Sequence, residues 1–391
     1  MGFFYSDDEA ATAKTTTKGV SIETMHSQRC KVCPRGGDLR LRHPKMEATG
    51  AKDSELYILG EAPGETEDRV GTQFVGRAGE TLRTALRRAS VNDEEGVRFN
   101  NVIRCRPPDN RTPEPIEIEC CRGFIEEDIQ RVKPRAIIAT GGVPLHWFLP
   151  HKESISSWRG RRIPIRVGTH ECWLYPIFHP SYVMRSRDQY GSGDVAEVFA
   201  RDLKRISAEL VELPQPDIHT REQLHDGVRL VTDPEDIDKI LRKLSKRELL
   251  ACDLETFAEP VSKSAPSTVF KPQAPNARIL SIALSYGERT YVLPYQRDEI
   301  SHSDQIKIKK SLARFLKSRT GGKTLIFQNS GFDFSWLYYF FREVIDTTTL
   351  WHDSQALAYA LDERKGMTNL GTLTLLNFGI DIKKYGPNDK S

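Results

Sequence analysis

The sequence predicts two consecutive α/β domains, the first built on a doubly wound parallel sheet. Short apolar runs typical of buried strands alternate with segments of helical periodicity, and this pattern restarts after Pro214-Gln215-Pro216-Asp217. Repeated strand, helix, strand units form a parallel sheet with helices on both faces. A chain of 391 residues is also long enough for two domains of about 100–200 residues each.

The composition changes along the chain in a way that sets the expected boundaries. Residues 1–27 are rich in Thr, Ala, Asp and Lys with little periodicity, which predicts a mobile arm. We expect a first domain over residues 28–210, a linker over 211–226 that contains the proline pair, and a second domain over 227–391.

The overall composition excludes several classes of protein. No run of 18 apolar residues is present, and the N-terminus lacks a basic region followed by an apolar core, so we expect no membrane partner and a cytoplasmic location. The net charge is only +3, so a nucleic-acid surface must be a local patch. Seven cysteines in clustered spacing indicate metal binding in a reducing compartment better than a disulfide framework.

In the first domain, strands are expected at residues 56–59, 99–103, 136–139 and 173–178. Helices are expected over residues 81–88, from Pro115 onward, and over 195–213. The proline-rich stretch 106–113 between the second strand and the second helix is expected to be irregular, because prolines remove donors and fix φ.

A glycine-rich loop follows the first strand and leads into the helix at 81–88. It runs from Gly60-Glu61-Ala62-Pro63-Gly64 to Phe74-Val75-Gly76-Arg77-Ala78-Gly79. In open α/β sheets, ligands bind at such strand ends. The loop carries four carboxylates and lacks the signatures of a phosphate cradle or a dinucleotide site. Without other motifs, a tight turn that binds nothing would explain it equally well.

Four cysteines have a spacing that suggests a metal centre. Cys30 and Cys33 form a C-x-x-C motif, Cys105 ends the second strand, and Cys121 lies sixteen residues later on a helix. Such a set can bind zinc or a [4Fe–4S] cluster, and a single C-x-x-C with two scattered thiolates favours the cluster. Cys120, Cys172 and Cys252 are expected to be ordinary buried thiols.

Over roughly residues 27–207 the chain resembles the family-four uracil-DNA glycosylases, which carry a [4Fe–4S] cluster. The resemblance rests on the cysteine spacing and on five sequence blocks in the family order. The blocks are Gly60-Glu61-Ala62-Pro63-Gly64, Phe74-Val75-Gly76-Arg77-Ala78-Gly79, Asn101-Val102-Ile103-Arg104-Cys105-Arg106-Pro107-Pro108, Asn110-Arg111-Thr112-Pro113 and His179-Pro180-Ser181.

The resemblance assigns roles in binding a flipped uracil. A glycosylase must move the base out of the stack into a pocket. Phe74 would stack on the uracil, and the Asn101 amide would match its Watson–Crick edge and reject cytosine. Gly60 lets the backbone approach closely. His179 would donate a hydrogen bond to uracil O2 as charge develops on the leaving base.

The resemblance leaves the water-activating group open. Ala62 occupies the loop position where the best-known uracil glycosylases have an aspartate, so Glu61 or Glu67 would have to position water. Gly64 stands where a tyrosine elsewhere blocks thymine, so another group must reject thymine. Residues 182–185, ending in Arg185, would fill the vacated stack, and residues 158–162 form a candidate phosphate-gripping loop.

In the second domain, strands are expected at residues 229–231, 249–255, 279–286 and 290–293, a helix at 233–244, and mainly helices from Ser303 onward. Asp253 and Glu255 point to one face of a strand, and Asn329 and Asp333 to one face of a helix start. Over about 226–385 this half resembles the 3′–5′ proofreading exonuclease domain of family A DNA polymerases, which implies a ribonuclease H-like fold.

That second resemblance implies Mg²⁺ or Mn²⁺ bound by Asp253, Glu255 and Asp333, and it matches Asp353-Ser354 to an Asp-Thr at a helix start. The family takes a further aspartate from a Tyr-x-x-x-Asp helix. The spacing Tyr385 to Asp389 contains Gly-Pro, which breaks a helix. We therefore expect this domain to be incomplete at its C-terminus and to be a poor nuclease alone.

Together, the two resemblances imply a uracil-DNA glycosylase linked to a proofreading-type exonuclease domain, as at the front of certain phage DNA polymerases. The expected substrate is uracil-containing DNA, single- or double-stranded, in a bacterial or phage-infected bacterial cell. The alternative is a non-catalytic module that binds uracil or template DNA. In that case the exonuclease half would act only with a separate polymerase chain.

Overall fold

The computed structural model describes residues 21–149, 154–190, 194–219, 223, 226–259, 271–319, 322–345, 349–364 and 366–380. The chain divides into two compact units, residues 1–218 with 374–391 and residues 219–373. Each unit contains its own six-stranded sheet. No helix in these residues is long and apolar enough to cross a membrane. The expected Tyr385–Asp389 spacing lies outside the described residues.

The sheet of the first unit has the strand order β1-β3-β2-β4-β6-β5. Its strands are β1 (Thr49–Gly50), β2 (Leu56–Gly60), β3 (Val97–Asn101), β4 (Ala136–Thr140), β5 (Ile163–Val167) and β6 (His170–Ile177). The four central strands are parallel, which confirms the predicted doubly wound sheet, and the edge strands β1 and β5 are antiparallel. These two edge strands are not among the strands predicted from the sequence.

The chain reverses its direction of winding between β2 and β4. From β2 it crosses to β3 on one side, and then to β4 on the other side of β2. At such a switch point the two following loops separate and leave a crevice at the carboxyl ends of the strands. The glycine-rich loop begins at this crevice, because it follows β2 directly.

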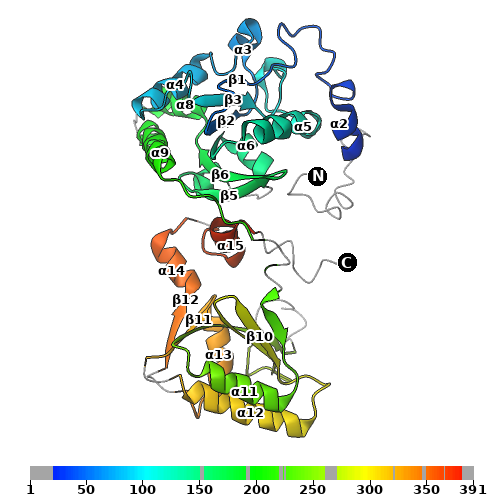
Figure 1. Cartoon of the computed structure of the whole chain (residues 1–391), viewed down its shortest axis with the longest axis vertical. Helices are drawn as coiled ribbons and strands as arrows, with labels where there is room; N and C mark the ends of the chain where they lie inside the picture. Colours follow the sequence, from blue (N-terminus) through cyan, green and yellow to red (C-terminus); the bar gives the residue numbers. More distant parts are fainter. Residues whose placement is uncertain are drawn as a thin grey trace. The chain divides into compact units, whose positions relative to one another are not determined.

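Helices cover both faces of this sheet (Figure 1). On one face lie α4 (Arg77–Arg88), α8 (Pro180–Tyr190) and α9 (Asp194–Val211), and on the other lie α5 (Pro115–Val132) and α6 (Gly142–Phe148). Leu82 and Leu86 of α4 are fully buried, as their spacing of four predicted. Two short helices, α3 (Glu65–Val70) and α7 (Ile155–Trp158), lie in the loops.

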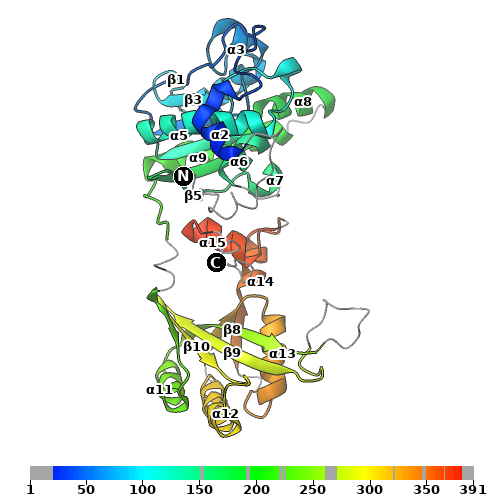
Figure 2. The ribbon, with the colours of Figure 1, turned by 90° about the vertical axis from the view of Figure 1, so that its right-hand side faces the viewer.

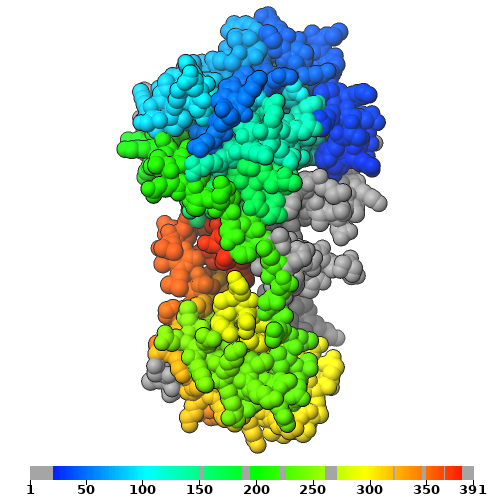
Figure 3. Space-filling view, in the orientation of Figure 1, coloured from blue at the N-terminus to red at the C-terminus, as the bar shows by residue number. Residues whose placement is uncertain are grey.

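Residues 21–31 differ from the arm predicted for residues 1–27. Helix α2 (Ile22–Gln28) begins at Ser21, whose hydroxyl accepts from the Thr24 amide, and a 3-10 turn (Arg29–Lys31) follows. Met25 is fully buried against α5, where it packs with Ile116 and Cys120. The space-filling view shows this segment, in dark blue, against the surface of the first unit (Figure 3). A single buried methionine has no periodicity, so the residue pattern does not predict a helix here.

The second unit has a mixed sheet in the order β12-β11-β8-β9-β10-β7. The strands are β7 (Val228–Leu230), β8 (Leu249–Phe257), β9 (Arg278–Tyr286), β10 (Arg289–Pro294), β11 (Thr324–Phe327) and β12 (Leu350–Asp353). Its helices are α11 (Pro234–Leu244), α12 (His302–Lys317), α13 (Ser330–Phe341) and α14 (Ser354–Leu361), and α15 (Leu370–Phe378) begins in this unit and ends in residues assigned to the first. Helices α11 and α12 pack side by side (Figure 2). The expectation of mainly helices after Ser303 overlooked β11 and β12, whose four residues are too few for a clear period.

Candidate functional site

Four neighbouring strand ends bring together residues that lie about forty positions apart in the sequence. Gly60 ends β2, Asn101 ends β3, Gly141 follows β4, and His179 follows β6. A Cβ on Gly60 would collide with Asn101 Oδ1 and with the Phe74 ring, and a Cβ on Gly141 would lie 3.0 Å from His179 Cβ. The glycines therefore leave the space in which these side chains meet at the crevice.

Phe74 is held in a left-handed backbone conformation, with φ of 54°. Such a conformation is unfavourable for a bulky residue and persists only where the surroundings fix it. Arg83 of α4 donates its Nε to the Phe74 carbonyl at 2.9 Å and places its guanidinium over the Phe99 ring. Gly79 permits this approach, because a Cβ there would overlap the Phe74 backbone.

Glu67 also fixes the Phe74 loop. Its carboxylate is buried and accepts three backbone N–H groups, from Gly64 at 3.2 Å, Val75 at 3.0 Å and Gly76 at 2.7 Å. Gly64 and Gly76 are the residues that precede α3 and α4. Both Glu67 oxygens are thus engaged with the backbone, and the residue is built into the loop. Only one of the two carboxylates expected to position water remains for that role.

That remaining carboxylate is Glu61, which is half-buried at the start of the loop beside the half-buried Ala62. In the part of the chain that the structure describes, no hydrogen bond engages its oxygens. Burial raises the pKa of Glu61, and the positive charge of Arg185 opposes this rise. An ionisable carboxylate with free oxygens at the mouth of the crevice can hold a water molecule.

His179 is a neutral hydrogen-bond donor in this arrangement. Its Nδ1 accepts the Ser181 backbone N–H at 3.1 Å and lies 2.6 Å from Ser181 Oγ. Arg185 donates to the same Oγ at 3.3 Å. Burial, aided by the Arg185 charge, lowers the pKa of His179 to about 4. Because Nδ1 accepts, the ring proton is on Nε2, which is the atom left to donate to a ligand.

Asn101 is almost completely buried, and two other amides contact it. Its backbone N–H donates to Asn100 Oδ1 at 2.9 Å, and its side-chain Nδ2 donates to Gln73 Oε1. Asn100 Nδ2 in turn donates to the Tyr57 hydroxyl, which donates to Asp128. Gln73 and Asn100 are functional residues that the sequence does not predict, because isolated polar residues beside a motif show no spacing pattern.

An open hollow of about 740 Å³ lies next to the Phe74 loop. It is lined by residues of the loop, of α4 and of α8, namely Thr66, Val75, Gly76, Arg77, Glu80, Thr81 and Met184. On α8, Tyr182 is 43% exposed whereas Val183 is buried in the core. Of the segment 182–185 expected to fill a vacated base stack, Val183 is therefore not available.

The candidate phosphate-gripping loop at residues 158–162 packs mainly against its own unit. Trp158 is fully buried. Arg159 forms an ion pair with Asp202 of α9 at 3.2 Å, and Arg162 lies over the Trp173 ring, 3.9 Å from Glu209. This corrects the expectation for Arg159 and Arg162, whose charges are already balanced by α9.

The four predicted metal-binding cysteines line one cavity. Cys30 and Cys33 come from the segment before β1, Cys105 from the loop after β3, and Cys121 from α5. Cys120 lines the same cavity and raises the number of thiols to five. Burial raises the pKa of Cys33 and of Cys105, and raises that of Cys121 to about 12. Within the described residues, no three His, Cys, Asp or Glu side chains are arranged to hold a single metal ion.

The chemistry of this cavity nevertheless fits a cluster. The Lys45 amide donates to the Cys105 sulfur at 3.2 Å, a contact that stabilises thiolate. Gly36 lies so close to Cys30 that a Cβ would overlap the Cys30 carbonyl, which keeps the loop tight around the thiols. Several deprotonated thiols in one buried place need a cationic centre between them. The residues present therefore suit the [4Fe–4S] group that the spacing predicted.

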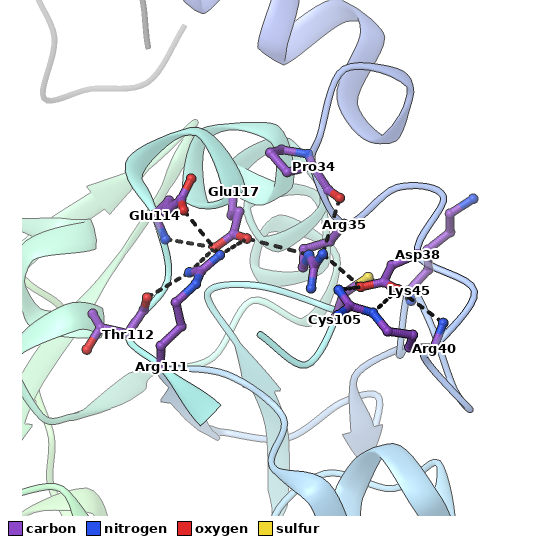
Figure 4. A network of polar contacts seen from close by, with 10 residues as sticks. All are labelled: Pro34, Arg35, Asp38, Arg40, Lys45, Cys105, Arg111, Thr112, Glu114 and Glu117. Carbon is purple, nitrogen blue, oxygen red and sulfur yellow. Dashed lines mark hydrogen bonds and ion pairs between the residues drawn. The ribbon is translucent and has the colours of Figure 1, made fainter. Parts of the chain in front are cut away.

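A buried ion network joins two of the three segments that carry these cysteines, namely the loop after Cys33 and α5 (Figure 4). Glu117 of α5 is fully buried and accepts two hydrogen bonds from Arg111, at 2.7 and 2.9 Å. Arg35, two residues after Cys33, lies 3.7 Å from Glu117 and 2.7 Å from Asp38. The Asn-Arg-Thr-Pro block thus has a structural task, since its arginine holds Glu117, the carboxylate that Arg35 of the cysteine loop also contacts.

In the second unit, the predicted carboxylates gather where β8 meets α13. Asp253 and Glu255 lie on one face of β8, and Asp333 of α13 is buried beside them, accepting the Leu254 N–H at 3.0 Å. Burial and the charges of Asp253 and Glu255 raise the pKa of Asp333 to about 7. The structure brings these three carboxylates together as predicted, although they are not arranged as a ready ligand set in the residues described.

Asp353 has a capping role instead. It accepts the backbone N–H groups of Ser330 and Asn329 at the start of α13, and of Gln355 and Ala356 at the start of α14. These donors lower its pKa. An aspartate at this helix start therefore joins two helix N-termini, which explains the Asp-Ser pair without a metal.

The first unit thus has the architecture of an α/β enzyme with its site at the strand switch point, and the comparisons specify its family. Residues 47–204 match the model of the Uracil DNA glycosylase superfamily. The type-4 uracil-DNA glycosylase of Thermotoga maritima is 36% identical over 191 residues, which are 48% of this chain and 93% of the relative. The type-4 uracil-DNA glycosylase of Pyrobaculum aerophilum is 31% identical over 195 residues, which are 48% of this chain and 97% of the relative. The chain belongs to the type-4 uracil-DNA glycosylases, a family of DNA-acting hydrolases.

A third relative extends the similarity beyond this unit. The DNA polymerase of Bacillus phage SP01 is 27% identical over 310 residues, which are 75% of this chain and 32% of the polymerase. This alignment is longer than the first unit and therefore reaches into the second. The chain spans about a third of that polymerase. Among solved structures, the Aedes aegypti Nibbler EXO domain matches with a TM-score of 0.30 at 15% identity, over 42% of this chain and 74% of that domain.

Proposed function

We propose that the first unit removes uracil from DNA by hydrolysing the bond between the base and its deoxyribose. The observation that carries the proposal is the neutral His179, whose Nε2–H points away from its Ser181 partner at the strand end opposite Asn101. The strands that end at these two residues are three inter-strand spacings apart, roughly 14 Å. This width suits a single pyrimidine held between two side chains.

Uracil recognition follows from the groups at the crevice. The base would be flipped out of the helix, because its bond to the sugar is not accessible within the stack. The Phe74 ring offers a face for stacking, and Asn101 offers one N–H and one carbonyl oxygen to the uracil O4 and N3–H. Arg185 beside Ser181 supplies a positive charge near the site.

Departure of the base requires stabilisation of negative charge. When the glycosidic bond breaks, its electron pair moves onto uracil and collects largely on O2. A neutral His179 already carries its proton on Nε2, so this N–H can donate a hydrogen bond to O2. The hydrogen bond becomes stronger as negative charge grows on O2. The sugar is left electron-deficient, a water molecule adds its oxygen to C1′, and the proton that this water loses passes through solvent to the released uracil anion.

We assign the positioning of this water to Glu61 and a scaffold role to Glu67. The support is that Glu67 already accepts three backbone N–H groups, whereas no hydrogen bond within the described residues engages the oxygens of the half-buried Glu61.

The test measures alkali-sensitive cleavage of a labelled oligonucleotide that contains one uracil, single-stranded and paired. We expect His179→Ala and Asn101→Ala each to lower excision at least about tenfold, since one lost donor in a dry site costs roughly 2–4 kcal/mol. His170→Ala is the matched control, because His170 lies at the other end of β6 and bonds the Pro134 carbonyl. Tight binding of uracil DNA without cleavage would favour the non-catalytic binding module instead.

The [4Fe–4S] cluster would be held by Cys30, Cys33, Cys105 and Cys121. When bound, it would neutralise the buried thiolates and cross-link the segment before β1, the loop after β3 and α5. Those segments lead into β1 and follow β3, so the cluster would stabilise the part of the sheet that presents Asn101.

For the second unit we propose a divalent-cation site with weak nuclease activity in this chain alone. The support is the convergence of Asp253, Glu255 and Asp333, three of the carboxylates that a two-metal site needs. It would hold a DNA 3′ end, alone or completed by a separate polymerase chain. The test is digestion of 3′-labelled single-stranded DNA with Mg²⁺ or Mn²⁺. Robust digestion that Asp253→Ala abolishes would overturn this proposal.

A further inference from the structure

Gln73 is a buried amide next to the residue that reads the base. It is fully buried, immediately precedes Phe74, and has both ends of its side-chain amide engaged. Its Nε2 donates to the Glu47 backbone carbonyl at 3.2 Å, and its Oε1 accepts from Asn101 Nδ2. The Glu47 carbonyl can only accept. It therefore fixes which end of the Gln73 amide points toward Asn101.

The same reasoning extends one residue further. Because Gln73 must present its oxygen to Asn101, Asn101 must present its NH₂ group to Gln73. A reversed Asn101 amide would set two acceptors against each other, and a reversed Gln73 would move that conflict to the Glu47 carbonyl. The backbone is also fixed, since the Asn101 N–H donates to Asn100 Oδ1.

We propose that Gln73 determines the specificity for uracil over cytosine by setting the orientation of the Asn101 amide. The inference rests on the proposed uracil excision and names a residue that controls it. Uracil presents an acceptor at O4 and a donor at N3, whereas cytosine presents a donor at N4 and an acceptor at N3. Asn101 in its held orientation matches uracil, and the same amide turned over matches cytosine. An asparagine alone is ambiguous, and the chain from Glu47 through Gln73 removes the ambiguity.

Gln73 is thus a positioning residue that acts through Asn101. If Gln73 only filled space beside Asn101, a methionine at position 73 would fill nearly the same volume and leave Asn101 in place, so the base preference would not change. Only the hydrogen-bonding character separates the two explanations. The test therefore compares base preference, which packing alone would leave unchanged.

The experiment measures binding of single-stranded oligonucleotides by fluorescence anisotropy, so that neither base must be unpaired first. Each carries one 2′-fluoroarabino nucleotide, either uridine or cytidine, because the fluorine destabilises the electron-deficient sugar and prevents cleavage. Gln73→Met and Gln73→Leu should lower the ratio of uracil to cytosine affinity at least about tenfold. Affinity for an oligonucleotide with neither base should not change.

Two further variants sharpen the comparison. Gln73→Glu keeps an acceptor toward Asn101 but loses the donor to Glu47, so it should keep most of the base preference and melt at lower temperature. Gln130→Met makes the same chemical change at a distant amide that accepts the Thr169 N–H, and should alter neither quantity.

The outcomes separate the two proposals. A wild-type chain that prefers uracil, with folded Gln73→Met and Gln73→Leu variants that keep the preference, would overturn the role of Gln73 alone. Equal loss of preference in Gln73→Glu and Gln73→Met would also overturn it, because it would indicate a packing effect. A wild-type chain that neither excises uracil nor prefers it would overturn the proposed function.

Discussion

The low pKa of His179 makes a quantitative prediction about stability. Burial and the Arg185 charge lower this pKa from the ordinary 6.5 to about 4. In the unfolded chain the imidazole takes up a proton as pH falls through about 6.5, whereas in the folded chain it does so only near 4. The unfolded state therefore binds more protons between these values, and stability is lost as the pH falls.

The magnitude follows from the two pKa values. The full difference corresponds to roughly 3 kcal/mol, of which about 2 kcal/mol is reached by pH 5. His179→Gln removes the titrating group but keeps a polar side chain of similar length. Between pH 7.5 and 5, the free energy of unfolding of the wild-type first unit should therefore fall by about 2 kcal/mol more than that of the variant.

The assay is urea unfolding at the two pH values, with hydrogen–deuterium exchange of peptides from β2 and β6 as the readout. These peptides report on the first unit alone. Equal losses in the wild type and in His179→Gln would refute the reasoning. They would mean that the imidazole is hydrated enough to titrate normally, and the argument for a neutral donor would fail with it.

Further expectations concern the cluster, the loop and the second unit. Anaerobically purified protein should be brown with close to one cluster per chain, and Cys105→Ser should lose the colour; a colourless wild type with stoichiometric zinc would contradict this. Glu67→Gln should lower the melting temperature by an amount equivalent to about 1–3 kcal/mol, because a buried acceptor of three N–H groups is weakened; an unchanged melting curve would argue against a scaffold role. Phe74→Ala should weaken binding of uracil DNA by about 1–3 kcal/mol in anisotropy titrations, and wild-type affinity would exclude stacking. Since the Asp333 carboxyl has a pKa of about 7, millimolar Mg²⁺ should raise the melting temperature more at pH 8, where this carboxyl is ionised, than at pH 5; no such difference between wild type and Asp253→Ala would rule out the cation site.

The fold was largely predictable because its parallel strands are short apolar runs separated by clear helical periods. The strands at 56–59 and 136–139 and the buried leucines of α4 are where the patterns placed them. The strands β11 and β12 were missed for the opposite reason. Four residues do not show a period, and the pairing of β11 with β8 and of β12 with β11 depends on the rest of the sheet.

The site was predictable where residues lie in motifs and unpredictable where roles depend on hydrogen-bond partners. Asn101 and His179 could be selected from their blocks. Nothing in the sequence separates Glu61 from Glu67, because the difference is whether the carboxylate meets backbone N–H groups. Gln73 could not be found at all, since its importance comes from the Glu47 carbonyl, which lies 26 residues away in the sequence.

The placement of the site residues at the ends of separate parallel strands has a consequence for how activity is gained and lost. Gly60, Asn101 and His179 come together only when β3, β2, β4 and β6 have paired in register, and each pairing requires a complete crossover through a helix. A partly assembled sheet contains no partial pocket. Activity should therefore appear late in folding and disappear in one step with the sheet, so that uracil excision serves as a direct measure of the cooperative unit.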